Sequence, residues 1–412
     1  MSWTLFYLKN TMINPQKTQP SQLPTPSSAQ TARSAQLIEQ IKQQIAAQGG
    51  WMGFDQYMNA ALYTPGLGYY ANELSPFSMW AEQGDFVTAP LLTPLFGATL
   101  AEQALEVFEL LENEPPCILE FGAGTGRLAA DILRHLAERG VAVRYQIMEL
   151  SATLQAQQRA TIHDALSTIE HTHQIEWLGE LPRAFVGLMI GNEVLDAMPV
   201  RLIGMDNSLS FERGVSVEHA QLVWQDRPCA EELPMPADWR EALRTSQAHY
   251  LSETHEQQIA FMHALAHSMQ RGVIIMIDYG FPAHEYYHPE RSRGTMMCHI
   301  QHVAHDEALY YPGVQDITAH VNFSALLPAE DADWQAIGYT SQANFLLNNG
   351  ILNLLAQIEP EQQRVHANRV QRLLSEAEMG ELFKVMAWSK GLDFAEDETL
   401  QGFIRGDRLH RL

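Results

Sequence analysis

The sequence has few cysteines, few basic residues and no long apolar run. Its three cysteines, Cys117, Cys229 and Cys298, are odd in number and far apart, which suits a reducing compartment. No apolar run approaches the roughly 18 residues that a membrane-spanning helix needs, so we expect no membrane insertion. The 26 basic residues stand against 49 acidic ones, and a net charge of -23 would repel a nucleic-acid backbone. These deficits disfavour nucleic acids and membranes as partners.

The first 35 residues are predicted to form a disordered tail. Gln, Ser, Thr and Pro dominate residues 15–34, and no acidic residue occurs before Glu39. Such a composition buries too little apolar surface to become ordered. The apolar residues 3–8 are too few for a signal peptide, and the arginine density of a transit peptide is missing. We therefore expect a cytoplasmic bacterial protein, with the mitochondrial matrix less favoured and Met12 as an alternative start.

The rest of the chain combines 46% apolar content with a regular alternation of strand and helix patterns. Residues 36–115 are predicted to form an N-terminal helical extension or lid. Alternating strands and helices begin near residue 116 and predict an α/β fold with a mostly parallel, doubly wound sheet over 116–412. Segments at about 201–255 and 282–345 interrupt the alternation and are predicted insertions. The expected strands cover residues 117–121, 144–149, 185–190, 273–277 and 383–388. One expected helix of this region begins at residue 127, and another covers residues 152–165.

A glycine-rich loop follows the first of these strands and predicts a cofactor site. Gly122, Gly124 and Gly126 lack the Cβ that would keep a ligand away from the backbone, and they tolerate positive φ. A dinucleotide-binding loop would have its third glycine where this chain has Arg127. The spacing after Glu120 instead favours S-adenosylmethionine (SAM) over NAD, with a plain tight turn as the structural alternative. Glu120 is a candidate cofactor-binding residue together with the three glycines.

The second strand ends in a carboxylate about twenty residues beyond the glycines. At this spacing, a neighbouring parallel strand places an acid against the ribose of a bound nucleoside. Glu149 is therefore the candidate ribose ligand. The alternative is a strand-end glutamate that faces water.

The strand at 185–190 is followed by Asn192, Glu193 and Asp196, which predict a reaction site at the carboxyl end of a central strand. Methyl transfer from SAM needs a nucleophile with a free lone pair, and an arginine guanidinium has none. Paired carboxylates bind the guanidinium and concentrate its lone pair on one nitrogen. The alternative is a helix N-cap with an acid in the first turn.

A series of short motifs runs along the chain from about Gly49 to Gly391. They are Gly84–Pro90, Phe96–Gly97, Glu120–Gly126, Asn192–Glu193, Asp196–Pro199, Ile277–Gly280, Arg293–Thr295, Gly313–Phe323, Thr340–Leu347 and Phe383–Val385. In these motifs the chain resembles the MidA family of class I SAM-dependent methyltransferases. This resemblance implies a Rossmann-like class I fold with SAM as the cofactor. It also implies a protein substrate, because the mitochondrial member symmetrically dimethylates an arginine of a respiratory-complex subunit.

Carried over by residue, the resemblance assigns the glycine loop to the methionine end of SAM, Glu149 to its ribose, and Asn192 with Glu193 to the cofactor and acceptor side. The chain departs from the family at Ala89, where serine is usual, and at Met297–His299, where the family is more basic and aromatic. These departures leave the acceptor's identity open.

Three further residues belong to the predicted site. Asp316 and His320 share a motif in which a histidine held by an aspartate could orient the acceptor or take up a proton. A loop-stabilising hydrogen bond is the equal alternative. Asp85 is either a turn residue or a polar member of a lid over the cofactor.

The sequence leaves two competing functions open: a small-molecule methyltransferase, and an assembly factor that binds SAM or a partner without turnover. The long insertions favour a macromolecular partner. The presence of acids at positions 193 and 196 argues against a protein that has lost catalytic activity. A metal site at His299, His302 and His305 is disfavoured, because the segment lacks the thiolate pairs of a structural zinc site. The oligomeric state is not predicted.

Overall fold

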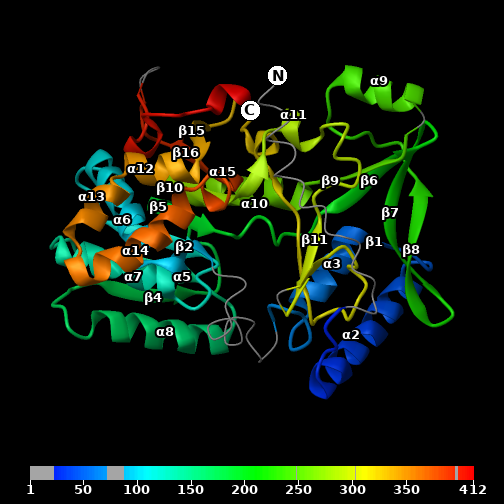
Figure 1. Cartoon of the computed structure of the whole chain (residues 1–412), viewed down its shortest axis with the longest axis horizontal. Helices are drawn as coiled ribbons and strands as arrows, with labels where there is room; N and C mark the ends of the chain where they lie inside the picture. Colours follow the sequence, from blue (N-terminus) through cyan, green and yellow to red (C-terminus); the bar gives the residue numbers. More distant parts are fainter. Residues whose placement is uncertain (1–22, 72–87, 247, 302, 395–397) are drawn as a thin grey trace. The chain divides into compact units, whose positions relative to one another are not determined.

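The computed structural model describes residues 23–71, 88–246, 248–301, 303–394 and 398–412 (Figure 1). The chain divides into two compact units, each assembled from segments that are far apart in the sequence. Unit 1 contains Met1–Leu74, Ala197–Thr254 and Tyr287–Ala319. Unit 2 contains Ser75–Asp196, His255–Tyr286 and His320–Leu412. The chain therefore leaves unit 2 and returns to it twice.

Unit 2 is built on an eight-stranded sheet in which seven strands follow the order β15-β16-β10-β5-β2-β3-β4 and β14 pairs with β10. Strands β10, β5, β2, β3 and β4 are parallel, whereas β16 runs antiparallel to β10 and β15. The predicted α/β fold with a mostly parallel sheet is confirmed. The strands are β2 (Cys117–Phe121), β3 (Arg144–Met148), β4 (Gln174–Leu178), β5 (Phe185–Asn192), β10 (Met269–Phe281), β14 (Val321–Asn322), β15 (Trp334–Ser341) and β16 (Phe383–Lys390).

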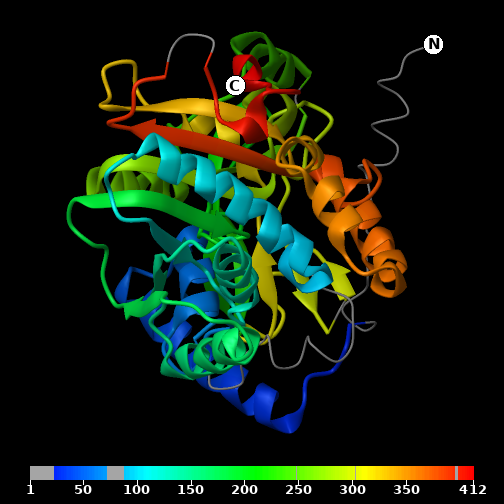
Figure 2. The ribbon, with the colours of Figure 1, turned by 90° about the vertical axis from the view of Figure 1, so that its left-hand side faces the viewer.

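Apolar side chains from the central strands and the surrounding helices form the core of unit 2. Figure 2 shows the long helix α6, in cyan, lying across one face of the sheet. Helix α6 begins after Thr93, whose Oγ1 accepts a hydrogen bond from Leu95 N, and Pro94 occupies its first turn. The helices are α5 (Ala89–Leu92), α6 (Pro94–Leu110), α7 (Arg127–Glu138), α8 (Ala152–Leu166), α10 (Glu256–Ser268), α11 (Ala283–Tyr286), α12 (Gln342–Asn348), α13 (Ile351–Gln357), α14 (Pro360–Leu374) and α15 (Met379–Leu382).

Unit 1 contains two antiparallel sheets and its own helices. Its larger sheet has the order β1-β7-β6-β9, with β8 paired to β7, and its smaller sheet has the order β12-β11-β13. The predicted insertion at 201–255 falls almost wholly in this unit, and the one at 282–345 is divided between the units. The elements are α2 (Ser28–Ala47), β1 (Met52–Gly53), α3 (Phe54–Tyr63), β6 (Arg201–Asp206), β7 (Leu209–Glu218), β8 (Gln221–Pro228), α9 (Ala237–Ser246), β9 (Tyr250–Thr254), β11 (Met297–Ile300), β12 (Val303–His305) and β13 (Asp316–Thr318).

Helix α2 begins at Ser28, inside the stretch that composition predicts to be a disordered tail. Ser27 and Gln30 form a reciprocal capping box that satisfies backbone N–H groups at the helix start. Leu37 and Ile41 are buried on one face of this helix. The tail prediction is therefore wrong for residues 28–35, while residues 1–22 lie outside the described part. No helix among the described residues is long and apolar enough to cross a membrane.

Candidate active site

The loop between β2 and α7 is built on glycines whose conformations other residues rarely adopt. Gly122, Gly124 and Gly126 have φ values of +66°, +51° and +82°. A Cβ on Gly122 would lie 2.7 Å from Cγ2 of Val194, and a Cβ on Gly126 would lie 2.9 Å from Cα of Gln158. The loop is thus packed against the segment after β5 and against α8. At Gly122 and Gly126 a side chain is therefore excluded by close contacts as well as by the positive φ.

Glu120 lies within β2, and the residue is 1% exposed. Oε2 accepts a hydrogen bond of 2.9 Å from the Tyr145 hydroxyl on β3. Burial raises the pKa of Glu120 to about 8, against the opposing effect of the Tyr145 hydrogen bond. The structure therefore shows Glu120 linking two strands as a largely protonated acid near pH 7, and its contact with a cofactor stays a prediction.

Glu149 follows β3 directly, and both of its carboxylate oxygens have protein donors. Oε1 accepts from Ser151 N at 2.8 Å, and Oε2 accepts from Gln158 Nε2 at 3.1 Å. Each carboxylate oxygen can accept more than one hydrogen bond, so capacity remains for ribose hydroxyls. The next side chain, Leu150, is 79% exposed, which places an apolar surface beside this carboxylate.

The last residue of β5 and the strained turn that follows it contain the next predicted residues. Glu193 has a φ of +53°, and its N–H donates to Ile277 O on β10 at 2.9 Å. Asn192 Nδ2 donates to Glu193 Oε1 at 3.0 Å. The buried Asn192 Oδ1 has no hydrogen-bond partner within the described part of the chain. An acceptor without a donor in a buried site indicates a place for a ligand donor.

Asp278 anchors this turn from β10, directly after the last residue that pairs with β5, and sequence reasoning gave it no role in the site. Its Oδ2 accepts the N–H groups of Leu195 and Asp196 at 2.9 and 3.1 Å, and its Oδ1 accepts Tyr279 N at 2.9 Å. Burial first, and then the carboxylates of Asp196 and Glu193, raise the pKa of Asp278 well above its usual range. The acids of this turn are therefore close enough to affect one another's ionisation.

Asp196 is also contacted by an aromatic group that the sequence did not single out. The Tyr279 hydroxyl donates to Asp196 Oδ2. His320 meets the Tyr279 ring edge-on at a centroid distance of 5.0 Å and stacks on Phe281 at 5.3 Å. Unit 2 thus brings Asp196, Tyr279 and His320 together.

Two predicted residues are not placed with this group. Asp316 lies on β13 in unit 1, where its Oδ1 accepts from the Tyr70 hydroxyl at 2.8 Å. Because His320 belongs to unit 2, the aspartate–histidine pair stays a prediction. Asp85 lies outside the described residues. Of the histidines in the disfavoured metal cluster, His299 and His305 lie on β11 and β12, and the described residues contain no group of three or more His, Cys, Asp or Glu suited to a metal ion.

The arrangement fits a nucleoside cofactor with a positive group beside it. Glu149, Glu193 and Asp196 follow the parallel strands β3 and β5 at one edge of the sheet, which is where α/β sheets bind ligands. The carboxylates of Glu193 and Asp196 favour a positive group at this edge. The glycine loop gives access to backbone groups, and the buried Asn192 Oδ1 offers an acceptor.

The chain is similar in sequence and fold to known proteins. Residues 99–340, more than half of the chain, match a family described as "Putative S-adenosyl-L-methionine-dependent methyltransferase". A Burkholderia thailandensis protein, solved in complex with S-adenosyl-homocysteine, is 44% identical, with a TM-score of 0.83 over 95% of this chain and 100% of that one.

The curated relatives are more distant and cover most of the chain. The mitochondrial protein arginine methyltransferase NDUFAF7 homolog of Drosophila melanogaster is 25% identical over 92% of this chain and 90% of its own length. The Danio rerio protein arginine methyltransferase NDUFAF7 is 25% identical over 89% of each chain. The family match over more than half of the chain, together with the similar structure that binds S-adenosyl-homocysteine, shows that the chain belongs to the MidA family of class I SAM-dependent methyltransferases.

Proposed function

We propose that this enzyme transfers the methyl group of SAM to a guanidino nitrogen of an arginine in a protein substrate. The observation that carries the proposal is the pair of acids, Glu193 and Asp196, on the turn after β5, which is held in place where the N–H groups of Leu195 and Asp196 donate to Asp278. A guanidinium is always protonated and has no free lone pair, so it must be bound and polarised before it can attack a methyl carbon. Closely placed carboxylates supply both functions.

The cofactor side of the proposal assigns a role to each element around the glycine loop. Backbone groups of Gly122–Gly126 would hold the methionine end of SAM, and Glu149 would accept the hydrogen bonds of the ribose diol. Asn192 Oδ1 would accept a donor from the cofactor or the acceptor arginine. These roles agree with the positive φ values of the loop and with the oxygen of Asn192 that lacks a protein donor.

The acceptor side requires a balanced displacement. One guanidino nitrogen forms a bond to the methyl carbon while the carbon–sulfur bond breaks, and S-adenosyl-homocysteine leaves with the electron pair. The nitrogen then loses a proton, for which Glu193 and Asp196 are the nearest proposed acceptors. His320, packed against Tyr279, is proposed to help transfer this proton away from the site.

The acceptor protein is proposed from the relatives of this chain. The curated relatives are named protein arginine methyltransferases at about one-quarter identity, which supports an arginine acceptor. The resemblance of the sequence motifs extends this to a subunit of a respiratory complex, which we propose as the first acceptor to test.

Comparative mass spectrometry of native cells with and without the gene tests the proposal. We expect at least one arginine-containing peptide to lose its methyl groups when the gene is deleted, and affinity capture to retain the same protein. Loss of a methylated small molecule instead would favour a small-molecule methyltransferase. A captured partner whose methylation is unchanged would favour an assembly factor without turnover.

A further inference from the structure

Gln158 lies at the centre of the hydrogen bonds that surround the predicted ribose ligand. Its side chain is fully buried on α8. Nε2 donates to Gly124 O at 3.0 Å and to Glu149 Oε2 at 3.1 Å. Oε1 accepts from Trp177 Nε1 at 2.8 Å. One amide group therefore joins the glycine loop, the end of β3 and strand β4.

We propose that Gln158 is a positioning residue that sets the orientation of Glu149 for the ribose of SAM, and that Trp177 fixes the orientation of Gln158. The inference rests on the proposed contact between Glu149 and the ribose. It adds two residues, neither of which is assigned to contact the cofactor.

The chemistry of the indole group determines which way the amide faces. A glutamine amide has a donor end and an acceptor end of nearly equal size, so packing alone does not choose between its two orientations. The indole N–H of Trp177 is a donor only, and it requires the amide oxygen to face β4. The amide nitrogen must then face Glu149 and Gly124, both of which offer acceptors.

Fixing both carboxylate oxygens fixes the plane of the carboxylate. Ser151 N holds Oε1 of Glu149, and Gln158 Nε2 holds Oε2. Without Gln158, the second oxygen would lose its buried donor and the carboxylate could rotate about its last torsion, which is soft. A diol must meet two acceptors at once, so ribose binding is sensitive to this rotation.

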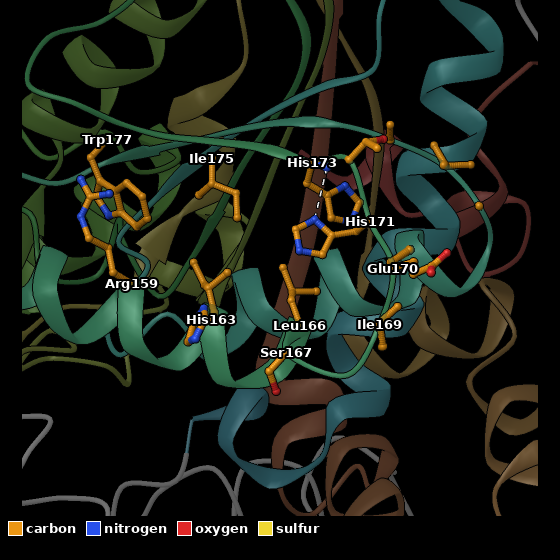
Figure 3. Close-up of a pocket in the computed structure, with 16 residues that line it drawn as sticks. Arg159, His163, Leu166, Ser167, Ile169, Glu170, His171, His173, Ile175 and Trp177 are labelled. Atoms are coloured by element: carbon orange, nitrogen blue, oxygen red, sulfur yellow. Dashed lines mark hydrogen bonds between the residues drawn. The ribbon is translucent and has the colours of Figure 1, made fainter.

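Trp177 is itself held in place. The guanidinium of Arg159 lies 3.7 Å above its ring centroid. Figure 3 shows this pair at one end of a groove of about 980 Å³ between α8 and β4. In the sheet, Trp177 is the register partner of Ile147, two residues before Glu149. The support for the carboxylate thus extends to the edge strand of the sheet.

The test compares two ligands that differ in one hydroxyl: S-adenosyl-homocysteine and its 2′-deoxy analogue. Calorimetry gives the dissociation constant of each for the wild type, Gln158→Leu, Trp177→Phe and a control, Gln157→Leu. Gln157 is the neighbouring residue of α8, and its side chain makes no hydrogen bond to the described residues. Thermal unfolding of each variant monitors the fold.

We expect the wild type and Gln157→Leu to bind the ribose ligand more tightly than the deoxy ligand. Gln158→Leu should bind the ribose ligand roughly tenfold to a hundredfold more weakly, the usual range for a hydrogen bond to a charged group. Its affinity for the deoxy ligand should fall much less, so the preference between the two ligands shrinks. Trp177→Phe should shrink the preference in the same direction and by a smaller factor.

Equal losses for both ligands in Gln158→Leu would overturn the proposal, because they would indicate a general loss of packing. An unchanged preference would also overturn it. If Gln158→Leu does not fold, Trp177→Phe decides the question, since an unchanged preference in that variant excludes the orienting role. A wild type without any preference would overturn both this inference and the ribose role of Glu149. None of these outcomes depends on the methyl acceptor.

Discussion

Replacing Glu120 with glutamine measures the effect of an ionisable carboxyl group buried beside the glycine loop. The pKa of Glu120 is raised from 4.5 to about 8 because the group is buried. Glutamine has nearly the same shape, keeps an oxygen that accepts from the Tyr145 hydroxyl, and does not titrate. The substitution therefore removes the titration while retaining the hydrogen bond of 2.9 Å between β2 and β3.

The sign of the effect follows from proton binding. Between pH 4.5 and about 8 the folded chain keeps a proton on Glu120 that the unfolded chain loses. Stability that is fully present below pH 4.5 is therefore lost as the pH rises through about 8. At about 1.4 kcal/mol for each pH unit, the loss from this residue is on the order of 5 kcal/mol. The variant lacks this loss, so its stability relative to the wild type should increase with pH up to about 8 and then level off.

Urea unfolding followed by circular dichroism at several pH values from 5 to 9 provides the measurement. The informative quantity is the difference in unfolding free energy between variant and wild type, because other groups titrate equally in both. Glu138→Gln, at an exposed glutamate on α7 that pairs with Arg134, is the matched control for replacing a glutamate outside the core. A difference for Glu120→Gln that is constant with pH, or that falls as pH rises, would refute the burial argument.

Three further substitutions test individual contacts. Gly126→Ala places a methyl group 2.9 Å from Cα of Gln158 at a φ of +82°, so SAM affinity by calorimetry should fall at least about tenfold; wild-type affinity would contradict the packing argument. Glu149→Ala should weaken SAM binding by roughly 1.5 to 3 kcal/mol, whereas unchanged affinity would assign Glu149 to the protein surface. Tyr279→Phe removes the donor to Asp196, so methyl transfer should fall roughly tenfold in a radiolabel assay while SAM affinity stays the same. An equal loss of SAM affinity would place Tyr279 on the cofactor side.

The local elements of unit 2 could be predicted because their signals are contiguous in the sequence. The strand before Gly122 has the predicted bounds Cys117–Phe121, and helix α7 begins at Arg127 as expected. The glycine spacing and the acid at the end of β3 are also readable from one short stretch each. Patterns of this kind depend on residues that are neighbours along the chain, so a single sequence contains them.

The supporting contacts could not be predicted, because they join residues that are far apart in the sequence. Asp278 accepts hydrogen bonds from the turn at Leu195 and Asp196, more than eighty positions earlier in the chain. In the sequence it can be recognised only as an acid near the end of a predicted strand. Gln158 stands in an unremarkable helix, and nothing local shows that Trp177 donates to it. The start of α2 differs from the prediction for another reason. The polar composition of its first residues predicts disorder, whereas Ser27 and Gln30 form a capping box that starts the helix.

Methyl transfer by Glu193→Gln tests the central claim most directly. The assay measures radiolabelled methyl incorporation from SAM into an extract of native cells that lack the gene product, followed by hydrolysis to identify the labelled amino acid. Calorimetry of SAM binding to the same variant is the control. We predict that the wild type labels methylarginine and that Glu193→Gln lowers the rate by about a hundredfold or more, as expected for the loss of one preorganised transition-state contact, with SAM affinity unchanged. Wild-type rates in Glu193→Gln, or label in another amino acid, would contradict an acidic clamp that methylates arginine.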